Sequence, residues 1–421
     1  LKDLKLRASW GKTGSMDGIS NWAAMSLVTS GGNSYNGSSG FKIGADAADL
    51  IWEKANQVNV GINAELFNGR LALSVDGYYQ KTSGLLYNIS TLATTGYTTR
   101  TANIGSLENK GLEVMVSGKI FDGPFKWELA TNLSYTKNKL LSLDGVLDMK
   151  INGGGANTGK VMHALMVGKP VSAFYMLRQD GIYQTDQEVP SKLYAKGVRA
   201  GDCKYFDYNN DGDITDDDRM YVGKVTPDIY GGITSTMNWK NFDLSIFCQF
   251  AAGGKILSAW KGCGGTEGTE HLGLASSSIK GYKNGTLVNS EQFYNISKYA
   301  ANHYWRGEGT SNTVPRPTLA GTFTGGFGNN LVSTRYLEDA SYFKFKTITL
   351  GYSLPHSLLS KIHVTGARIF VSLDNFFTLT KYSGYDPEFS YESNPTGNSY
   401  GADFGEQATL KSFIIGASIN F

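Results

Sequence analysis

The sequence has few of the residues that build disulfide-bonded, soluble or membrane-spanning helical proteins. Its 421 residues include three cysteines and nine prolines, and charged residues make up 18%, below the roughly 25% usual in soluble domains. Cys203, Cys248 and Cys263 match no metal or redox spacing, and we interpret them as small, semi-apolar residues. No stretch approaches the 18 consecutive apolar residues that a transmembrane helix needs. Residues 1–11 alternate in polarity and do not form a secretion signal.

Charge and histidine placement exclude several classes of function. The 39 basic and 37 acidic residues are interspersed and give a formal net charge of +2, which argues against a nucleic-acid-binding surface. The five histidines are scattered without ligand spacing, so we expect surface roles for His163, His271, His303, His356 and His363. No His, Ser and acidic residue are placed together as in a hydrolase, and the sequence therefore predicts no enzyme.

What the chain does contain is glycine, aromatic residues and alternation. There are 52 Gly, 24 Tyr and 21 Phe, and polarity is carried mainly by Asn, Ser, Thr and Gly. Residues 241–250 alternate strictly, with one face made of Phe242, Leu244, Ile246, Cys248 and Phe250. A period of two places side chains on opposite faces of a strand. The alternating segments are about 10–14 residues long, close to what a tilted strand needs to cross a bilayer.

The pattern predicts an all-β fold, a transmembrane antiparallel barrel wall of about ten strands. We expect these strands at 4–14, 55–67, 70–83, 109–121, 125–139, 228–239, 242–252, 340–352, 366–379 and 409–421. A single short helix is expected at 355–362. Two readings stay open on alternation alone: a complete small barrel without its export signal, or the later part of a larger barrel.

Short and long connections alternate along this predicted sheet. Asn68-Gly69 suits a type I′ hairpin turn, and Asp122-Gly123-Pro124 and Lys240-Asn241 form two further tight joins. The long polar connections are 15–54, 84–108, 140–227, 253–339 and 380–408. Short periplasmic turns and long extracellular loops are typical of outer-membrane barrels. Five aromatic residues flank the tight turns, as expected at a membrane interface, although they could also cap a soluble sheet: Phe67, Phe125, Trp127, Trp239 and Phe242.

Several motifs, in order over nearly the whole chain, resemble the SusC/RagA family of TonB-dependent outer-membrane transporters of the Bacteroidota. They include LKLRASWGKTG (4–14), GSLENKGLEV (105–114), FDYNNDGDITDDDR (206–219), YLEDASYFKFKTITLGYSLP (336–355) and KYSGYDPE (381–388). The resemblance implies a 22-stranded barrel, of which residues 1–421 would be the last ten or so strands, without the N-terminal plug and the earlier strands. It also implies as partners a SusD-like surface lipoprotein and, through the plug, TonB–ExbB–ExbD.

One segment carries a recognisable metal-ligand spacing. In residues 207–218, Asp207, Asn209 and Asp211 stand at positions 1, 3 and 5, and Gly212 at position 6. This spacing wraps a loop so that oxygens converge on Ca²⁺. The Asp213 carbonyl, the Thr215 side chain and Asp218 at position 12 complete the predicted set. We expect a structural Ca²⁺ that pins the long extracellular loop 140–227, the alternative being a solvated acidic turn.

The sequence thus predicts an outer-membrane importer that is in contact with membrane lipid. The leading hypothesis is TonB-dependent uptake of an oligomeric nutrient, glycan or peptide, together with the SusD-like lipoprotein. A passive porin, or a surface receptor or adhesin without energy coupling, is the alternative. The aromatic tracts 294–305 and 382–391 could stack on sugars or peptides, or simply pack within loops. The sequence does not identify substrate-binding residues.

Overall fold

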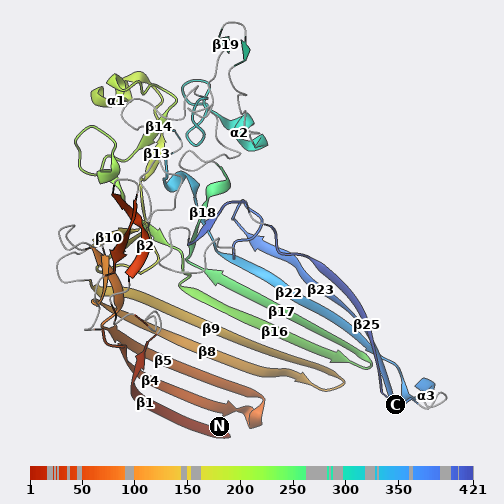
Figure 1. Ribbon diagram of the computed structural model, residues 1–421. Helices are drawn as coiled ribbons and strands as arrows, with labels where there is room; N and C mark the ends of the chain where they lie inside the picture. The colour runs from red at the N-terminus through yellow and green to blue at the C-terminus, as the bar shows by residue number, and fades with distance from the viewer. Residues whose placement is uncertain are drawn as a thin grey trace. The chain divides into compact units, whose positions relative to one another are not determined.

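We analysed a computed structural model of the chain (Figure 1). It describes residues 1–16, 22, 25, 28–35, 38–44, 50–90, 99–143, 149–152, 163–261, 282–283, 286–287, 297–317, 328–329, 331–359, 364–388, 400–405 and 407–420. The chain divides into two compact units. The N-terminal unit holds residues 1–150 and 165–171, and the C-terminal unit holds residues 151–164 and 172–421.

Five long antiparallel strands form the sheet of the N-terminal unit, each paired with its neighbour in sequence. They are β1 (Asp3–Ser15), β4 (Glu53–Leu66), β5 (Leu71–Ser83), β8 (Ser106–Asp122) and β9 (Phe125–Ser142). Pairing is in register over whole strands, from Asp3 opposite Glu65 to Ser15 opposite Glu53 between the first two. Alternating β-branched, aromatic and polar residues favour extended strands that have one apolar face and one solvated face.

The C-terminal unit has a second set of five long antiparallel strands, again paired in chain order. They are β16 (Ile229–Trp239), β17 (Phe242–Ala252), β22 (Tyr342–Ser353), β23 (Gly366–Thr380) and β25 (Ser412–Asn420). The 11 residues of β17 reach roughly 37 Å at about 3.4 Å per residue. With the tilt usual in membrane barrels, that length covers the apolar band of roughly 25 Å.

All ten predicted strands are therefore confirmed, with ends that differ by a few residues. The predicted turns also hold. Asn68 and Gly69 both have positive φ, and the Arg70 amide donates to the Phe67 carbonyl, as in a type I′ turn. Phe67 is left-handed as well, with φ of 51°. The helix predicted at 355–362 is seen as α3 (His356–Leu359), and residues 360–363 lie outside the described part.

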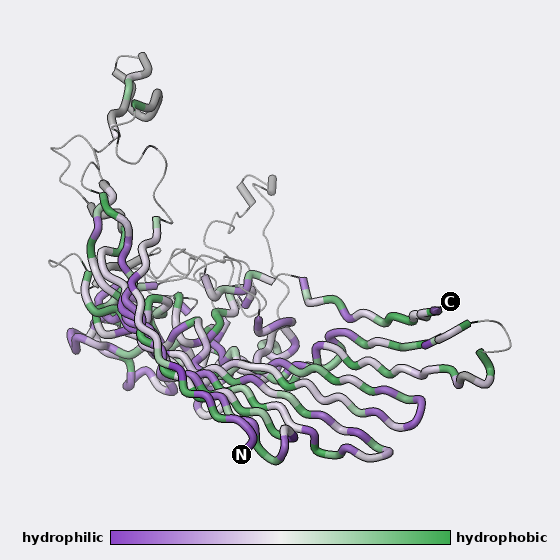
Figure 2. Tube along the Cα trace, turned by 90° about the horizontal axis from the view of Figure 1, so that it is seen from below, coloured by the Kyte–Doolittle hydropathy of each residue, from purple (hydrophilic) through white to green (hydrophobic). Residues whose placement is uncertain are grey.

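The long strands have two different faces, and the alternation can be followed along the trace in Figure 2. One face is apolar and open: Leu6 is 71%, Phe413 60% and Ile415 66% exposed. Such large apolar areas mark an interface rather than a wet surface. The opposite face carries charged, amide and hydroxyl groups, among them Arg7, Asp76, Asp243 and Arg368.

Small elements fill the long connections, where the sequence predicts only polar loops. In the N-terminal unit they are β2 (Val28–Tyr35), β3 (Ser38–Ile43), β6 (Leu86–Ser90) and β7 (Thr99–Asn103). Between β9 and β16 lie β10 (Met149–Asn152), β11 (His163–Met166), β12 (Ala173–Met176), β13 (Gln179–Ile182), α1 (Ser191–Ala195), β14 (Cys203–Tyr205) and β15 (Met220–Lys224). Later come β18 (Lys255–Ser258), β19 (Tyr282–Lys283), β20 (Thr286–Leu287), α2 (Lys298–His303), β21 (Leu337–Asp339) and β24 (Ala402–Asp403).

The connections of the C-terminal unit contain its buried hydrophobic cores. One cluster gathers Leu177, Tyr183, Val189, Leu193, Val198, Cys203, Tyr205, Ile214 and Leu331. A second gathers Phe174, Met176, Leu257, Ala259, Val332, Tyr336 and Ala402. Their members come from segments more than 150 residues apart in sequence, which no local periodicity reveals. These connections are therefore packed like a small globular domain.

Ion pairs on the polar face lie across a glycine of the strand between the partners. In the N-terminal unit, Arg7 on β1 reaches over Gly61 to Asp76 on β5, at 2.8 Å between Nη2 and Oδ1. In the C-terminal unit, Arg368 on β23 reaches over Gly351 to Asp243 on β17, at 2.9 Å between Nε and Oδ1. A Cβ at either glycine would collide with the paired groups. Glycine thus permits side chains two strands apart to meet.

We expect Gly351→Ala to displace the Arg368–Asp243 pair and to lower the stability of the protein by about 1 kcal/mol, the upper range for partly exposed pairs. Gly77→Ala is the matched control, because the nearest atom to its Cβ lies at 4.0 Å. The urea midpoint of the complete receptor, followed by heat-modifiable migration in gels, measures both. Equal midpoints for the two variants would contradict this account.

Candidate functional site

The segment 381–388 is fastened to the polar face of the C-terminal sheet by a charged cluster. Lys344 Nζ donates to Asp386 Oδ1 at 2.9 Å and also contacts Glu388. Lys346 donates to Glu388 Oε2 at 3.0 Å. Glu388 also accepts hydrogen bonds from the neutral side chains of Tyr342, at 2.8 Å, and Gln249, at 3.1 Å. We call these six residues the Lys344 cluster.

A break in strand register positions the two lysines. The pairing of β22 with both neighbours shifts between Phe345 and Thr347, and Lys346 is an extra residue relative to β17. An extra residue reverses the alternation beyond it. Lys344 and Lys346 consequently share the polar face with Thr347 and Thr349. Without the bulge, the lysines and the two threonines could not all face the same side.

The cluster holds its carboxyl groups ionised. Burial raises the pKa of Asp386, but hydrogen bonds from Thr409, the Glu388 amide and Lys344 outweigh burial and leave the pKa below its ordinary value. Burial likewise raises the pKa of Glu388, and donors led by Lys344 and Tyr342 lower it overall. Lys344 itself is 2% exposed. Removing one partner of such a buried pair costs about 3–5 kcal/mol, because the other charge stays buried and unpaired.

A cleft opens beside this cluster. Its volume is about 240 Å³, and polar groups from Lys255, Tyr342, Glu388 and Tyr400 lie along it among apolar neighbours. The volume is slightly below the usual range of small-ligand pockets, about 300–1,000 Å³. The cleft could receive one sugar ring or one peptide side chain.

A second buried charge joins two of the long connections. Asp202 is fully buried and accepts from Arg316 at 2.9 Å, from Asn329 at 3.0 Å and from the Arg199 amide at 2.8 Å. Arg316 and Asn329 each lie more than 110 residues from Asp202 in the sequence. Because an unpaired buried carboxylate is costly, this contact fixes the connection after β9 to the connection after β17.

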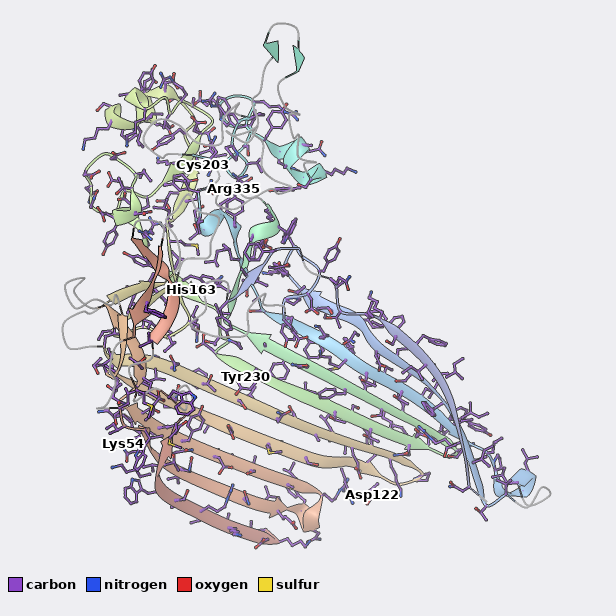
Figure 3. The ribbon with its side chains drawn as sticks, viewed as in Figure 1. Lys54, Asp122, His163, Cys203, Tyr230 and Arg335 are labelled. Atoms are coloured by element: carbon purple, nitrogen blue, oxygen red, sulfur yellow. The ribbon has the colours of Figure 1, made fainter. Side chains whose placement is uncertain are left out.

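His163 and Cys203, to which the sequence assigns no specific role, are both buried in the C-terminal unit. His163 is 2% exposed and stacks on Phe174 with ring centroids 4.9 Å apart, so the surface role expected for it is wrong. Its ring nitrogens lie 3.2 and 2.8 Å from the carbonyl oxygens of Ala173 and Tyr400. Cys203 is buried next to Arg335 (Figure 3), and burial raises the pKa of its thiol. Cys263, His271 and His363 lie outside the described residues.

The Asp-rich loop adopts a tight, internally bonded turn. Asp207 Oδ1 and Asn209 Oδ1 both accept from the Asp211 amide, at 3.2 and 3.0 Å, and Asp211 Oδ1 accepts from the Asp213 amide at 2.7 Å. Gly212 has φ of 78°, a left-handed conformation that allows the chain to turn sharply at position 6. The side-chain oxygens of positions 1, 3 and 5 therefore face the interior of the turn.

The other three predicted ligands have additional partners. Both oxygens of Asp218, which is fully buried, accept from backbone amides, those of Tyr208 and Thr215. The Asp213 carboxylate pairs with Lys196 at 2.6 Å, which is compatible with its carbonyl acting as the ligand. Thr215 caps residues 216–218 through its hydroxyl. Over the described residues, no three His, Cys, Asp or Glu side chains gather closely enough to hold a metal. Ca²⁺ binding stays a prediction.

The aromatic tracts divide between packing and exposure. Tyr382 is buried and donates to Asp403 at 2.6 Å, whereas Tyr385 is 77% exposed. Tyr299 is half exposed and stacks on His303 with centroids 4.3 Å apart. Residues 294–296 and 389–391 lie outside the described part. Among the described tyrosines of these tracts, Tyr385 is therefore the most exposed, and Tyr299 has one ring face against His303.

Two features define the class of protein. Long antiparallel strands carry an open apolar face and a charged polar face, and each unit has tight turns at one end of its sheet and long connections at the other (Figure 1). That combination defines the wall of a membrane β-barrel. In the described part of the chain, no helix is both long and apolar enough to cross a membrane.

Comparison with known proteins agrees with this class. Residues 1–246 match the family described as TonB dependent receptor-like, beta-barrel. The chain belongs to this family. It is 30% identical to TonB-dependent receptor P3 of Formosa agariphila over 99% of this chain and 39% of that protein. It is 27% identical to TonB-dependent receptor SusC of Bacteroides thetaiotaomicron over all of this chain and 38% of that protein.

Solved structures give the same fold. A structure described as the RagAB peptide transporter matches with a TM-score of 0.74 and 24% identity, over 100% of this chain and 41% of that one. The chain spans about two fifths of the length of these relatives. The family is a receptor and transporter class of the outer membrane and is not an enzyme class. The tight turns therefore lie on the periplasmic side, the long connections on the extracellular side.

Sequence reasoning missed the Lys344 cluster and the ion pairs that cross a glycine. The sequence shows KYSGYDPE (381–388) as a motif but gives no sign of its contact with β22, because nothing local links the two segments. Arg368 and Asp243 lie 125 positions apart in the sequence, and only the order of the strands in the sheet brings them together. In the register of the sheet Asp243 lies opposite Gly351, whereas Arg368 lies opposite Ser353 and reaches Asp243 diagonally past Gly351.

We expect acidification to release the segment 381–388. Carboxyl groups with lowered pKa stabilise the folded state above their ordinary pKa of about 4, and this stabilisation is lost as pH falls through the lowered values of Asp386 and Glu388. A spin label at Tyr385→Cys should be immobile at pH 7 and should become mobile only well below about pH 4, once both carboxyl groups are protonated. In Lys344→Met the label should be mobile at both pH values.

The control is a label at Tyr299→Cys, which lies outside the cluster and should not respond to Lys344→Met. Both labelled proteins carry Cys263→Ser, while Cys203 and Cys248 are buried. A Tyr385→Cys label that stays immobile in Lys344→Met would show that the charged cluster does not anchor the segment.

Proposed function

We propose that this chain supplies wall and outward connections to a TonB-dependent importer of an oligomeric nutrient, glycan or peptide. The observation that carries the proposal is the inward-fastened segment 381–388 on a charged polar face. A purely structural wall does not need a surface connection tied to its interior. Family membership supports uptake across the outer membrane.

Partner proteins follow from the same proposal. The family uses TonB for energy, and we propose that TonB–ExbB–ExbD acts through a plug encoded outside residues 1–421. We also propose a SusD-like surface lipoprotein that covers the extracellular connections. The structure described as RagAB is a peptide transporter, which supports an oligomeric substrate for this chain without fixing its chemistry.

Uptake in the native cell tests the proposal. Cells expressing the complete receptor should accumulate labelled oligosaccharides or casein peptides, and uptake should fall to background after deletion of tonB or after treatment with a protonophore. Lys344→Met should reduce uptake severalfold, while Lys298→Gln, an exposed charge change outside the cluster, should leave uptake unchanged. Uptake that persists without TonB would identify a passive porin instead. Binding without uptake would identify a receptor or adhesin.

We further propose that the loop 207–218 binds a structural Ca²⁺. The side-chain oxygens of Asp207, Asn209 and Asp211, which face the interior of the turn, are the first ligands, completed by the Asp213 carbonyl, Thr215 and Asp218. Oxygen ligands suit this hard cation. Closure of the site requires Asp218 to exchange at least one amide bond for the metal.

Calcium should protect this loop from proteolysis. We expect millimolar Ca²⁺ to slow cleavage within residues 196–224 severalfold, since extracellular sites bind with Kd of about 10⁻⁴–10⁻³ M. Asp207→Asn and Asp211→Asn should abolish the protection, and Asp217→Asn, outside the predicted set, should retain it. Cleavage rates independent of Ca²⁺ and of the chelator EGTA would contradict the assignment.

A further inference from the structure

A groove on the apolar face of the C-terminal unit is the feature that the proposed function leaves unexplained. Its volume is about 720 Å³. Its apolar lining comes from Ile233, Phe250, Phe343 and Leu379. Phe250 pairs with Phe343, and Phe343 with Leu379, so these side chains project from one face of three neighbouring strands. That face is the open, lipid-contacting one.

The shape of the groove comes from a change in side-chain size near the end of the strands. The rings of Phe250 and Phe343 are nearly parallel, with centroids 6.4 Å apart, and Leu379 is 64% exposed beside them. Beyond this row the lining of β17 and of the residue before β22 consists of two small residues, Ala252 and Ser341. Large side chains followed by small ones leave a hollow against the bilayer.

The groove ends in polar groups at its extracellular side. Ser341 precedes β22, and Thr380 and Lys381 end and follow β23. Ser341 donates to Asp339 at 2.6 Å, and Thr380 donates to the Ser341 carbonyl at 2.8 Å. These bonds hold the rim in one conformation. The hollow is thus apolar on its membrane side and polar at the level of the headgroups.

The charge at the rim favours an anion. Lys255 and Lys381 both act electrostatically on the single lining carboxylate, Asp339. The nearby Asp228 is paired with Lys224. Lys381 is the cation that lines the rim, and Lys255, which lines the 240 Å³ cleft, adds a second positive charge acting on Asp339. Basic residues at this level attract anionic headgroups, by about 1 kcal/mol each.

We propose that this groove binds an acyl chain of a lipid A-type glycolipid, with a phosphate of its headgroup at Lys381. The groove is continuous with the lipid-facing belt, which is why the occupant is a membrane lipid rather than a protein. The long connections place it in the outer leaflet, where the lipid is a phosphorylated, acylated sugar. The inference depends on the membrane orientation and is independent of the nutrient imported.

Native mass spectrometry of the complete receptor with added lipid A tests the site. We expect one tightly bound lipid A in the wild type and weaker binding of phosphatidylglycerol. Ala252→Phe should fill the hollow and weaken the first binding event by about tenfold. Lys381→Gln should weaken it by about fivefold.

Two matched controls separate the groove from the general lipid surface. Ala417→Phe makes the same change on the exposed apolar face of β25, and Lys298→Gln removes a charge far from the groove in sequence. Both should bind lipid A like the wild type, and heat-modifiable migration checks that every variant is folded. Equal weakening by Ala252→Phe and Ala417→Phe would overturn the proposal. Equal affinity of the wild type for phosphatidylglycerol and lipid A would overturn it as well.

Discussion

Main-chain hydrogen bonding between antiparallel strands is the constraint on which this structure depends. Hydrocarbon offers no partner to a backbone N–H or C=O group, so each must be satisfied by a neighbouring strand. The long in-register ladders, from Asp3 opposite Glu65 to Gly366 opposite Asn420, satisfy this requirement. Because the backbone groups are used in strand pairing, successive side chains point alternately to the lipid and to the polar face. Charged and polar side chains are therefore found on the polar face and in the connections.

The charged groups accordingly lie on the polar face and in the connections. The ion pairs Arg7–Asp76 and Arg368–Asp243 each lie over a glycine. Each charge is thus neutralised by its partner on a face of the wall that is only partly solvated. The Lys344 cluster extends the same chemistry to the extracellular end, where the bulge in β22 turns two lysines toward segment 381–388. A connection that begins at the surface is thereby tied to the polar face of the wall.

The connections are the second structural level. Their cores around Tyr183 and Tyr336, and the buried Asp202 contact, make them a packed layer with its own stability. This rigidity matters for a receptor, since a partner protein or a substrate meets a formed surface and loses less conformational entropy on binding. The groove beside Phe250 and Phe343 extends to Asp339 and Lys381, so a lipid held there would contact the wall where the connections meet the strands.

The sequence alone determined the strands, their faces and the order of short and long connections, because a period of two and turn residues such as Asn68-Gly69 act over a few residues. It also indicated the family and the acidic loop 207–218. Only the tertiary structure decided which side chains meet. His163 appeared to be a surface residue and is buried against Phe174, and Asp386 reaches Lys344 across 42 positions of sequence. Such contacts depend on strand register and on the packing of distant segments, which local pattern does not encode.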